Sequence, residues 1–167
     1  MRVFLIGFMG AGKSTTGRAR AQRTGALFVD LDERIAAGLS MTVPEIFRRL
    51  GEGAFRAEES RQLEACGRFE DAVVATGGGT FTLEANRLLI ARLGVSVFLD
   101  PPWPEVLRRL PGKRDDRPLF STPENAYDLY RSRLQHYRQA DFHVRPQESE
   151  DPEAIAGRIA QLLGELG

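Results

Sequence analysis

The stretch at residues 7–14 constrains the fold more than any other part of the chain, and its sequence is GFMGAGKS. It fits the pattern G-x-x-x-x-G-K-[ST] at every fixed position, which is typical of a loop that cradles phosphate groups. The apolar run Val3–Ile6 before it predicts a buried strand, and residues 14–23 after it predict a helix. Strand, glycine-rich loop and helix in this order predict a binding site for a nucleoside triphosphate.

Each part of this loop has a physical task. Its glycines let the backbone curl so that successive N–H groups point at anionic oxygens, and the helix N-terminus adds a partial positive charge. Lys13 can reach the β- and γ-phosphates, and the Ser14 hydroxyl can bind Mg²⁺. A plain glycine-rich connector is the alternative, and the surrounding strand and helix argue against it. The expected nucleotide contacts are Gly10, Ala11, Gly12, Lys13, Ser14 and Thr15.

The chain has 167 residues, which suffices for one domain with a proper core. Its 23 Lys and Arg residues balance 23 Asp and Glu residues, so the overall charge gives no sign of a nucleic-acid or membrane partner. Basic residues gather within 108–117, which favours a compact anionic ligand over a long polyanion. A solvated helix face is the alternative explanation for part of this group.

Cys66 is the only cysteine, which excludes an intramolecular disulfide and a cysteine-rich metal site. Because the first strand begins near the N-terminus, we expect no signal peptide, and no apolar run approaches the ~20 residues that span a bilayer. We therefore expect a cytoplasmic protein. We also expect a monomer whose partners are small molecules, not nucleic acid or membrane.

Short apolar runs alternate with helical patterns along the whole chain. This alternation predicts parallel strands joined by right-handed crossovers, and therefore a three-layer α/β fold with a five-stranded parallel sheet flanked by helices. The expected strands lie near Val3–Ile6, Leu27–Val29, Val73–Ala75, Val95–Leu99 and Phe142–Val144.

Local signals mark several helix ends. Thr42 and Glu45 have the spacing of a capping box at the start of a short helix. Gly51 is expected to end that helix before another begins at residues 52–68. Asp151, followed by proline, marks a further helix start.

Two carboxylates follow the second expected strand, at Asp30 and Asp32. Strand alternation places both on the same side at the carboxyl end of the strand, where open α/β sheets bind ligands. One of them can hold a metal, directly or through water, while the other accepts or orients the proton of an attacking hydroxyl. An ordinary helix N-cap at Asp32 is the alternative.

The third expected strand runs directly into three glycines at residues 77–79. P-loop proteins often end the corresponding strand with a metal-binding Asp, whereas here bare backbone can approach a ligand closely. We expect this turn to form the floor of an acceptor pocket. Arg56 is expected to overhang the same edge, where a guanidinium suits a carboxylate, although a surface arginine is the alternative.

The segment Pro111–Pro123 is rich in Arg, Asp and Pro and has little apolar content. Long irregular connections of this kind in compact domains are often active-site lids. A plain surface loop is the alternative, and the arginines argue against it.

Taken together, these segments resemble the shikimate kinase family, and the resemblance covers nearly the whole chain. The P-loop alone is shared by many other proteins, whereas the ordered combination of motifs is far more specific. The motifs are GFMGAGKST at 7–15 followed by Gly17, DLD at 30–32, FR at 55–56 followed by EE at 58–59, GGG at 77–79, RPL at 117–119, and Arg133 within 131–137 leading to AD at 140–141.

The resemblance implies transfer of the γ-phosphoryl group of ATP to the 3-hydroxyl of shikimate, a step of chorismate and aromatic amino-acid synthesis, with Mg²⁺ as cofactor. It implies a P-loop fold like that of the nucleoside monophosphate kinases, formed by a single domain over residues 1–167. Within this domain we expect a core at about 1–32, 70–110 and 140–167, a shikimate-binding region at about 33–61 and a lid at about 111–123.

On the nucleotide side, the resemblance implies that Lys13 contacts phosphate and takes part in catalysis. It implies the same of Arg117, which would reach the phosphates from the lid. Arg109 would lie against adenine, and Arg108 stays an alternative because the start of the lid differs in length among relatives. Ser14 would bind Mg²⁺, and Asp30 would reach the metal through water.

On the acceptor side, the resemblance implies that Asp32 contacts the shikimate hydroxyls and is the catalytic base. Two arginines would clamp the shikimate carboxylate, and the backbone of the glycine turn would hold a hydroxyl. The expected acceptor contacts are Asp32, Arg56 and Arg133 with the glycines Gly77, Gly78 and Gly79.

Two other functions compete with this interpretation. Another small-molecule P-loop kinase, acting on gluconate or on a nucleoside monophosphate, would share the phosphate cradle and a lid but would not need all the acceptor residues together. A GTP-dependent switch is the rival from a different class. The chain lacks the Asn-Lys-x-Asp and Asp-x-x-Gly motifs that such a switch would carry.

Overall fold

The computed structural model describes residues 1–110 and 122–164, and within them the strands form one five-stranded parallel sheet in the order β2-β3-β1-β4-β5. All five strand predictions are confirmed to within one residue at each end. The strands are β1 (Arg2–Ile6), β2 (Leu27–Asp30), β3 (Ala72–Ala75), β4 (Val95–Leu99) and β5 (Phe142–Val144).

The central strand β1 explains why its sequence is an unbroken apolar run. Val3 pairs with Val73 of β3 on one side and with Val95 of β4 on the other. Phe4, Leu5 and Ile6 are completely buried. Because helices cover both faces of the sheet, side chains of either alternation enter a core, and the four positions after Arg2 are all apolar.

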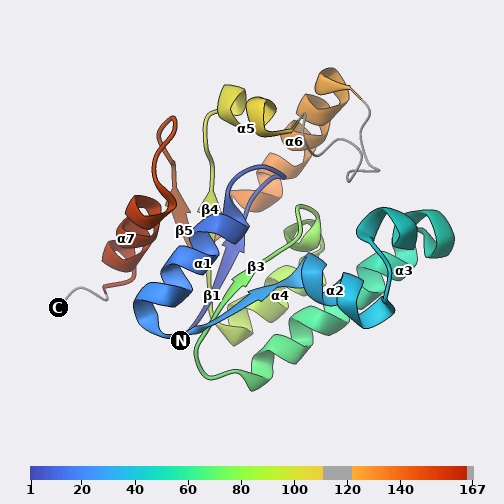
Figure 1. Cartoon of the computed structure of the whole chain (residues 1–167), viewed down its shortest axis with the longest axis horizontal. Coiled ribbons are helices and arrows are strands. Elements are labelled where there is room, and N and C mark those ends of the chain that lie inside the picture. The colour runs from blue at the N-terminus through green and yellow to red at the C-terminus, as the bar shows by residue number, and fades with distance from the viewer. Residues whose placement is uncertain (111–121, 165–167) are drawn as a thin grey trace.

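Helices cover both faces of this sheet, as the three-layer prediction requires (Figure 1). On one face, Leu5 and Val97 of the sheet pack with Ile155 and Ile159 of α7, and α1 lies beside α7. On the other face, α3, α4 and α6 pack against the sheet. The helices are α1 (Lys13–Thr24), α2 (Leu31–Leu39), α3 (Val43–Ala65), α4 (Glu84–Leu93), α5 (Trp103–Arg109), α6 (Pro123–Tyr137) and α7 (Pro152–Leu162).

The predicted helix ends are confirmed by their hydrogen bonds. The Thr42 N–H donates to Glu45 Oε2 at 2.8 Å, and the Glu45 N–H donates to Thr42 Oγ1 at 3.3 Å, which completes the capping box. Gly51 has φ 85° and interrupts α3, so the two helices that the sequence predicts meet there at a kink. Asp151 caps α7 by accepting from the Glu153 N–H at 2.9 Å.

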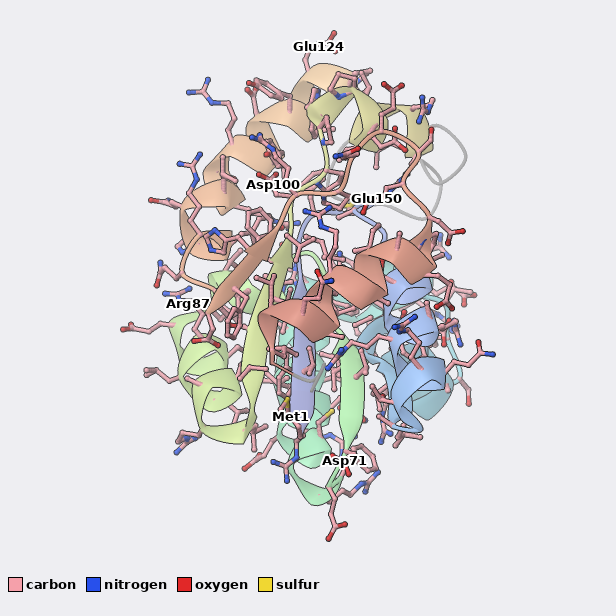
Figure 2. The ribbon with its side chains drawn as sticks, turned by 90° about the vertical axis from the view of Figure 1, so that its left-hand side faces the viewer. Met1, Asp71, Arg87, Asp100, Glu124 and Glu150 are labelled. Carbon is pink, nitrogen blue, oxygen red and sulfur yellow. The ribbon has the colours of Figure 1, made fainter. Side chains whose placement is uncertain are left out.

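The parallel strands give the molecule two distinct ends, as Figure 2 shows. Met1 and Asp71, which precede β1 and β3, lie at the amino ends of the strands, and the N-terminal amine pairs with Asp71. Asp100 follows β4 and lies toward the opposite end, where Glu124 lies in the first turn of the long helix α6. Ligands of open α/β sheets bind beyond the carboxyl ends of the strands, so the site belongs at this second end.

The segment from α2 through the first part of α3 stands to the side of the sheet (Figure 1) and has a small core of its own. Ile35, Ile46 and Phe55 form that core, and the Phe47 ring packs against Phe55 at a tilt, with 4.8 Å between ring centroids. In the part of the chain that the structure describes, no helix is both long and apolar enough to cross a membrane.

Candidate active site

The glycine-rich loop between β1 and α1 adopts the conformation that its sequence predicts. Gly10 and Gly12 have φ 76° and 91°, a left-handed region that favours glycine, and Gly12 is the N-cap of α1. A side chain at Gly7 would lie only 2.7 Å from the Leu99 carbonyl oxygen. The Lys13 ammonium folds back over the loop and donates to the carbonyls of Gly7 and Phe8 at 2.7 and 2.8 Å.

A pocket opens at the carboxyl edge of the sheet in front of this loop. Its lining includes most of the predicted P-loop contacts, both acidic residues and the first two glycines of the triplet. Ala11 is the exception among the P-loop contacts, because it is buried within the loop. Its lining comprises Met9, Gly10, Gly12, Lys13, Ser14, Thr15, Asp30, Asp32, Thr76, Gly77 and Gly78.

Asp30 ties the P-loop helix to α2. Its Oδ2 accepts from the Ser14 hydroxyl at 2.6 Å, while its Oδ1 accepts from the N–H groups of Asp32 and Glu33 at 3.1 and 3.3 Å. Asp30 is therefore the N-cap of α2, and the alternative that placed an N-cap at Asp32 is wrong.

The strand alternation expected for the two acids is wrong as well. The chain leaves β2 at Asp30 and enters α2 at Leu31, so Asp32 lies in the first helical turn. The cap formed by Asp30 forces this early turn. Asp32 nevertheless lines the pocket, and a Cβ added at Gly77 would lie 3.0 Å from Asp32 Oδ1.

The glycine triplet after β3 lies against charged side chains that leave no room for a Cβ. One at Gly77 would lie 2.5 Å from Glu59 Oε1, and one at Gly78 would lie 3.0 Å from Arg133 Nη1. One at Gly79 would overlap the Arg56 guanidinium. All three glycines thus permit close approach of the predicted arginines and of a buried carboxylate.

Glu59 holds the first of these arginines in place. Its side chain is completely buried on α3, and its Oε2 accepts from Arg56 Nη1 at 2.9 Å. Its Oε1 accepts from the Thr80 hydroxyl at 2.6 Å. Both oxygens of the carboxylate are therefore satisfied, as a buried charge requires. Glu52 lies on the outer side of Arg56 at 3.6 Å.

Arg133 reaches the same turn from α6. It is only 7% exposed, and its buried Nη1 finds no hydrogen-bond acceptor among the described residues. Beside it, the Tyr137 hydroxyl donates to the Gly78 carbonyl at 2.5 Å, and burial raises the pKa of Tyr137 to about 12. A buried guanidinium nitrogen without an acceptor is costly, so this corner is suited to an anionic group.

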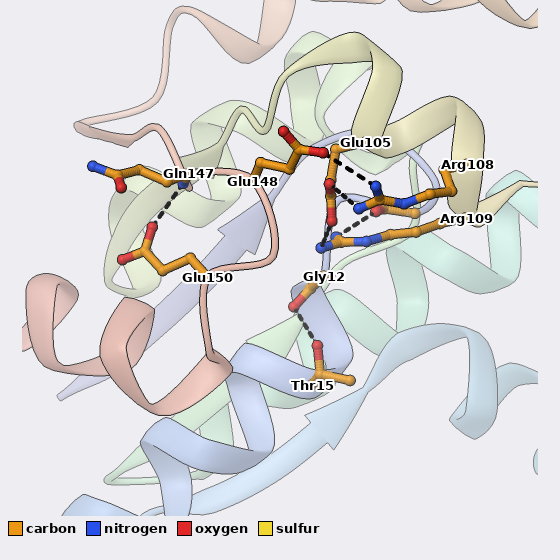
Figure 3. Close-up of polar contacts among 9 residues, drawn as sticks. Gly12, Thr15, Glu105, Arg108, Arg109, Gln147, Glu148 and Glu150 are labelled. Carbon is orange, nitrogen blue, oxygen red and sulfur yellow. Dashed lines mark hydrogen bonds and ion pairs between the residues drawn. The ribbon is translucent and has the colours of Figure 1, made fainter.

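At the other side of the P-loop, the short helix α5 directs two neighbouring arginines differently (Figure 3). Arg109 Nη1 donates to the Gly10 carbonyl at 3.0 Å, whereas Arg108 turns toward Glu148 at 3.3 Å. Arg109 is therefore the arginine that lies on the phosphate loop. Both guanidinium groups also bond Glu105.

Arg117 and the expected lid lie almost wholly outside the described residues. Of the predicted segment Pro111–Pro123, the structure describes only its end, where Thr122 caps α6 by accepting from the Asn125 N–H at 3.1 Å and Pro123 begins the helix.

Comparison with known protein families gives a match to the family described as shikimate kinase over residues 9–164. The chain belongs to the shikimate kinase family. The shikimate kinase of Prochlorococcus marinus is 40% identical over 167 residues, covering 98% of this chain and 86% of the relative. The shikimate kinase of Synechococcus elongatus is 38% identical over 164 residues, covering 96% and 85%.

Solved structures support the same family assignment. The shikimate kinase of Acinetobacter baumannii in complex with shikimate superposes with a TM-score of 0.92 at 32% identity, over 98% of this chain and 93% of that one. A deoxyadenosine kinase from M. mycoides with bound dATP superposes with a TM-score of 0.63 at 16% identity, over 98% of this chain and all of the other. The second likeness shows the P-loop kinase fold alone.

Two residues of this shikimate kinase site went unassigned in the sequence-based prediction. Glu59 lies three residues after Arg56, and Glu105 lies four residues before Arg109, both of which are spacings that put side chains on one helix face. The signal was present in each case. It could not be recognised without knowing that these carboxylates are buried, because the same spacing is common on solvated helix faces.

Proposed function

We propose that this chain transfers the γ-phosphoryl group of ATP to the 3-hydroxyl of shikimate, giving shikimate 3-phosphate and ADP in the chorismate and aromatic amino-acid pathway. One observation carries the proposal. Arg56 on α3 and Arg133 on α6 are far apart in the sequence but lie against neighbouring glycines of one turn. The first two glycines of this turn line the same pocket as the P-loop. Two guanidinium groups at one corner match a single carboxylate, and the pocket beside them suits hydroxyls.

The nucleotide side of the mechanism is electrostatic. The N–H groups of the loop and the N-terminus of α1 hold the phosphates, and Lys13 exchanges its carbonyl partners for the β- and γ-phosphate oxygens. Arg109 lies beside the loop, in position to contact the nucleoside part of ATP. Arg117, which lies outside the described residues, supplies a further positive charge to the transferring phosphoryl group.

Ser14 and Asp30 form an oxygen pair that suits Mg²⁺. Their contact at 2.6 Å lies at the pocket edge, and Mg²⁺ typically keeps several waters and takes only one or two protein oxygens besides phosphate. Among the described residues, no group of three or more His, Cys, Asp or Glu side chains is arranged so that it could hold a metal ion by itself. The bound ion would neutralise charge on the phosphates during transfer.

On the acceptor side, Arg56 and Arg133 bind the carboxylate of shikimate and fix its orientation. Asp32 then accepts a hydrogen bond from the reacting hydroxyl and takes its proton as the bond to phosphorus forms. The glycine turn at residues 77–79 brings bare backbone to the ring hydroxyls. The Glu59 carboxylate keeps the Arg56 fork in its binding orientation in advance, which lowers the entropy cost of binding.

The division of the chain into a core, a shikimate-binding region at 33–61 and a lid at 111–123 belongs to this proposal, as do a monomeric state and a cytoplasmic location. The lid has a chemical reason. Transfer to a sugar-like hydroxyl must exclude water, since otherwise ATP would be hydrolysed.

A coupled assay of ADP release, with shikimate as the sole acceptor, tests the proposal. We expect turnover with shikimate and none above background with gluconate or a nucleoside monophosphate. The Lys13→Met variant provides the matched blank for contaminating kinases. Turnover with one of the other acceptors and none with shikimate would replace the proposed function with the corresponding kinase.

A further inference from the structure

The short helix α5 carries one acidic and two basic residues on a single face. Glu105 lies three and four residues before Arg108 and Arg109, so all three side chains meet at one side of the helix. Figure 3 shows this group beside the P-loop, with Gly12 below it and Glu148 reaching in from the loop after β5.

Glu105 differs from an ordinary surface carboxylate because its side chain is only 3% exposed. Its Oε1 accepts from Arg109 Nη2 at 2.8 Å, and its Oε2 accepts from Arg108 Nη2. Burial alone would raise the pKa of Glu105, but Arg109 and Arg108 outweigh it and lower the pKa, so the carboxylate is ionised at neutral pH. Each oxygen thus holds one guanidinium.

The two arginines then diverge. Arg109 uses its other terminal nitrogen to bond the Gly10 carbonyl at 3.0 Å, and that nitrogen would lie 3.4 Å from a Cβ at Gly12. Arg108 instead leads outward to Glu148, whose side chain is 76% exposed. The contacts of Glu105 through Arg109 therefore lead to the phosphate loop, whereas those through Arg108 lead to an exposed residue.

We propose that Glu105 is a positioning residue of the nucleotide site, which holds the Arg109 guanidinium on the P-loop before the nucleotide binds. An arginine side chain has many rotamers, and ordering it on binding costs affinity. A buried carboxylate four residues earlier fixes the side chain in advance and removes that cost. The inference rests on the proposed function in taking the P-loop pocket as the nucleotide site and Arg109 as a nucleotide contact.

The substitution Glu105→Gln isolates this role. Glutamine has nearly the same shape but only one side-chain oxygen, and its NH₂ group faces a guanidinium that can only donate. Its single oxygen must therefore serve both arginines, and without the ionic attraction. Both arginines are partly exposed, at 34% and 55%, so each can reach water and no charge is trapped in the interior.

Calorimetric titration with ADP tests the proposal as a double-mutant cycle of Glu105→Gln and Arg109→Met. We expect Glu105→Gln to weaken ADP binding roughly two- to tenfold, the range that ordering one long side chain represents. The double variant should bind no more weakly than Arg109→Met alone, because Glu105 acts through Arg109. Shikimate affinity, measured in parallel, should not change, whereas a merely structural role would weaken both ligands.

Glu148→Gln is the matched control, because it removes the same charge from the exposed partner of Arg108 and leaves the contacts of Arg109 unchanged. It should bind ADP like the wild type.

If Glu105→Gln fails to fold, Glu105→Asp keeps the charge but shortens the reach and takes its place in the cycle. Unchanged ADP affinity, effects that add in the double variant, or a parallel loss for shikimate would each overturn the proposal. A wild-type protein that binds ADP but does not phosphorylate shikimate would instead contradict the proposed function and leave Glu105 testable.

Discussion

The two sides of the site are built in different ways. The nucleotide side is built mainly on one continuous stretch, residues 7–15, between β1 and α1, beside which α5 adds Arg109. The acceptor side is assembled from side chains on α2, α3 and α6 around a glycine turn after β3. Phosphate can be bound by the N–H groups that any sequence has, whereas a specific acid with hydroxyls needs particular side chains.

The two arginines of the proposed acceptor side also differ from each other, in whether an acidic partner is already present. Arg56 is neutralised in advance by Glu59 at 2.9 Å, whereas Arg133 has a buried nitrogen with no acceptor among the described residues. In the proposed mechanism, the first arginine contributes geometry, since its charge is already balanced. The second would contribute attraction, because an arriving anion would satisfy its unmet hydrogen bond. Binding sites commonly keep such locally unfavourable groups at a cost in stability.

The largest effect should come from the nucleotide side. Lys13→Met removes the charge that stabilises the transferring phosphoryl group, and we expect kcat to fall by about 1,000-fold or more. Far-UV circular dichroism and thermal unfolding should stay near those of the wild type, because the ammonium packs in no apolar core. Arg23→Met, at the far end of α1 with only a 3.8 Å contact to Glu153, is the control and should keep full activity. Near-normal turnover of Lys13→Met would contradict the role of Lys13 in stabilising the transferring phosphoryl group.

The next effect should separate the two acids that lie between the two sides. Asp32→Asn removes charge and basicity from the acceptor side, and we expect kcat to fall by about 100-fold. Asp30→Asn should cost less, because asparagine is also a good N-cap and still accepts from Ser14. Steady-state kinetics with saturating ATP and shikimate measure both. The reverse order would move the acceptor role to Asp30.

The contrast between the sides also explains what the sequence could predict. The P-loop and the five strands follow from contiguous patterns, and the structure confirms them. The three glycines at 77–79 predicted a close approach of the ligand. The structure adds a second reason for glycine there, because side chains at these positions would crowd Glu59 and the two arginines. These features depend on local backbone chemistry, which a single stretch of sequence carries.

Features that depend on distant contacts could not be predicted in the same way. The position of Asp32 was predicted by strand alternation, but Asp30 caps α2, which begins at Leu31, one residue before Asp32. The choice between Arg108 and Arg109 depends on which of them meets Gly10, about a hundred residues away. The importance of Glu59 depends on its burial beneath Thr80, which no local pattern shows.

A matched pair of substitutions sharpens the contrast between the two arginines. Arg56→Met and Arg133→Met should each weaken shikimate binding by about ten- to a hundredfold and leave ADP binding nearly unchanged. Their effects on stability should differ. Arg56→Met leaves Glu59 buried without its ionic partner and should lower the free energy of unfolding by about 3 kcal/mol. Arg133→Met keeps the volume, removes a costly charge, and should be neutral or stabilising.

Calorimetry with each ligand measures the shikimate and ADP affinities of both variants, and urea unfolding of the ligand-free proteins measures their stability. Equal losses of ADP and shikimate affinity would place the carboxylate clamp elsewhere. Equal losses of stability in the two variants would remove the distinction between a paired and an unpaired arginine, even if both bind shikimate.

The smallest effect concerns the tyrosine that fixes the glycine turn. Burial raises the pKa of Tyr137 from 10 to about 12, so folding favours the neutral phenol that donates to Gly78. The resulting stability is present below pH 10 and is lost as pH rises toward 12, by about 2–3 kcal/mol. Tyr137→Phe has no such proton to lose. Urea unfolding at pH 9, 10, 11 and 12 should therefore show the wild type falling relative to Tyr137→Phe. A difference that stays constant with pH would mean that this phenol is not what holds the acceptor turn.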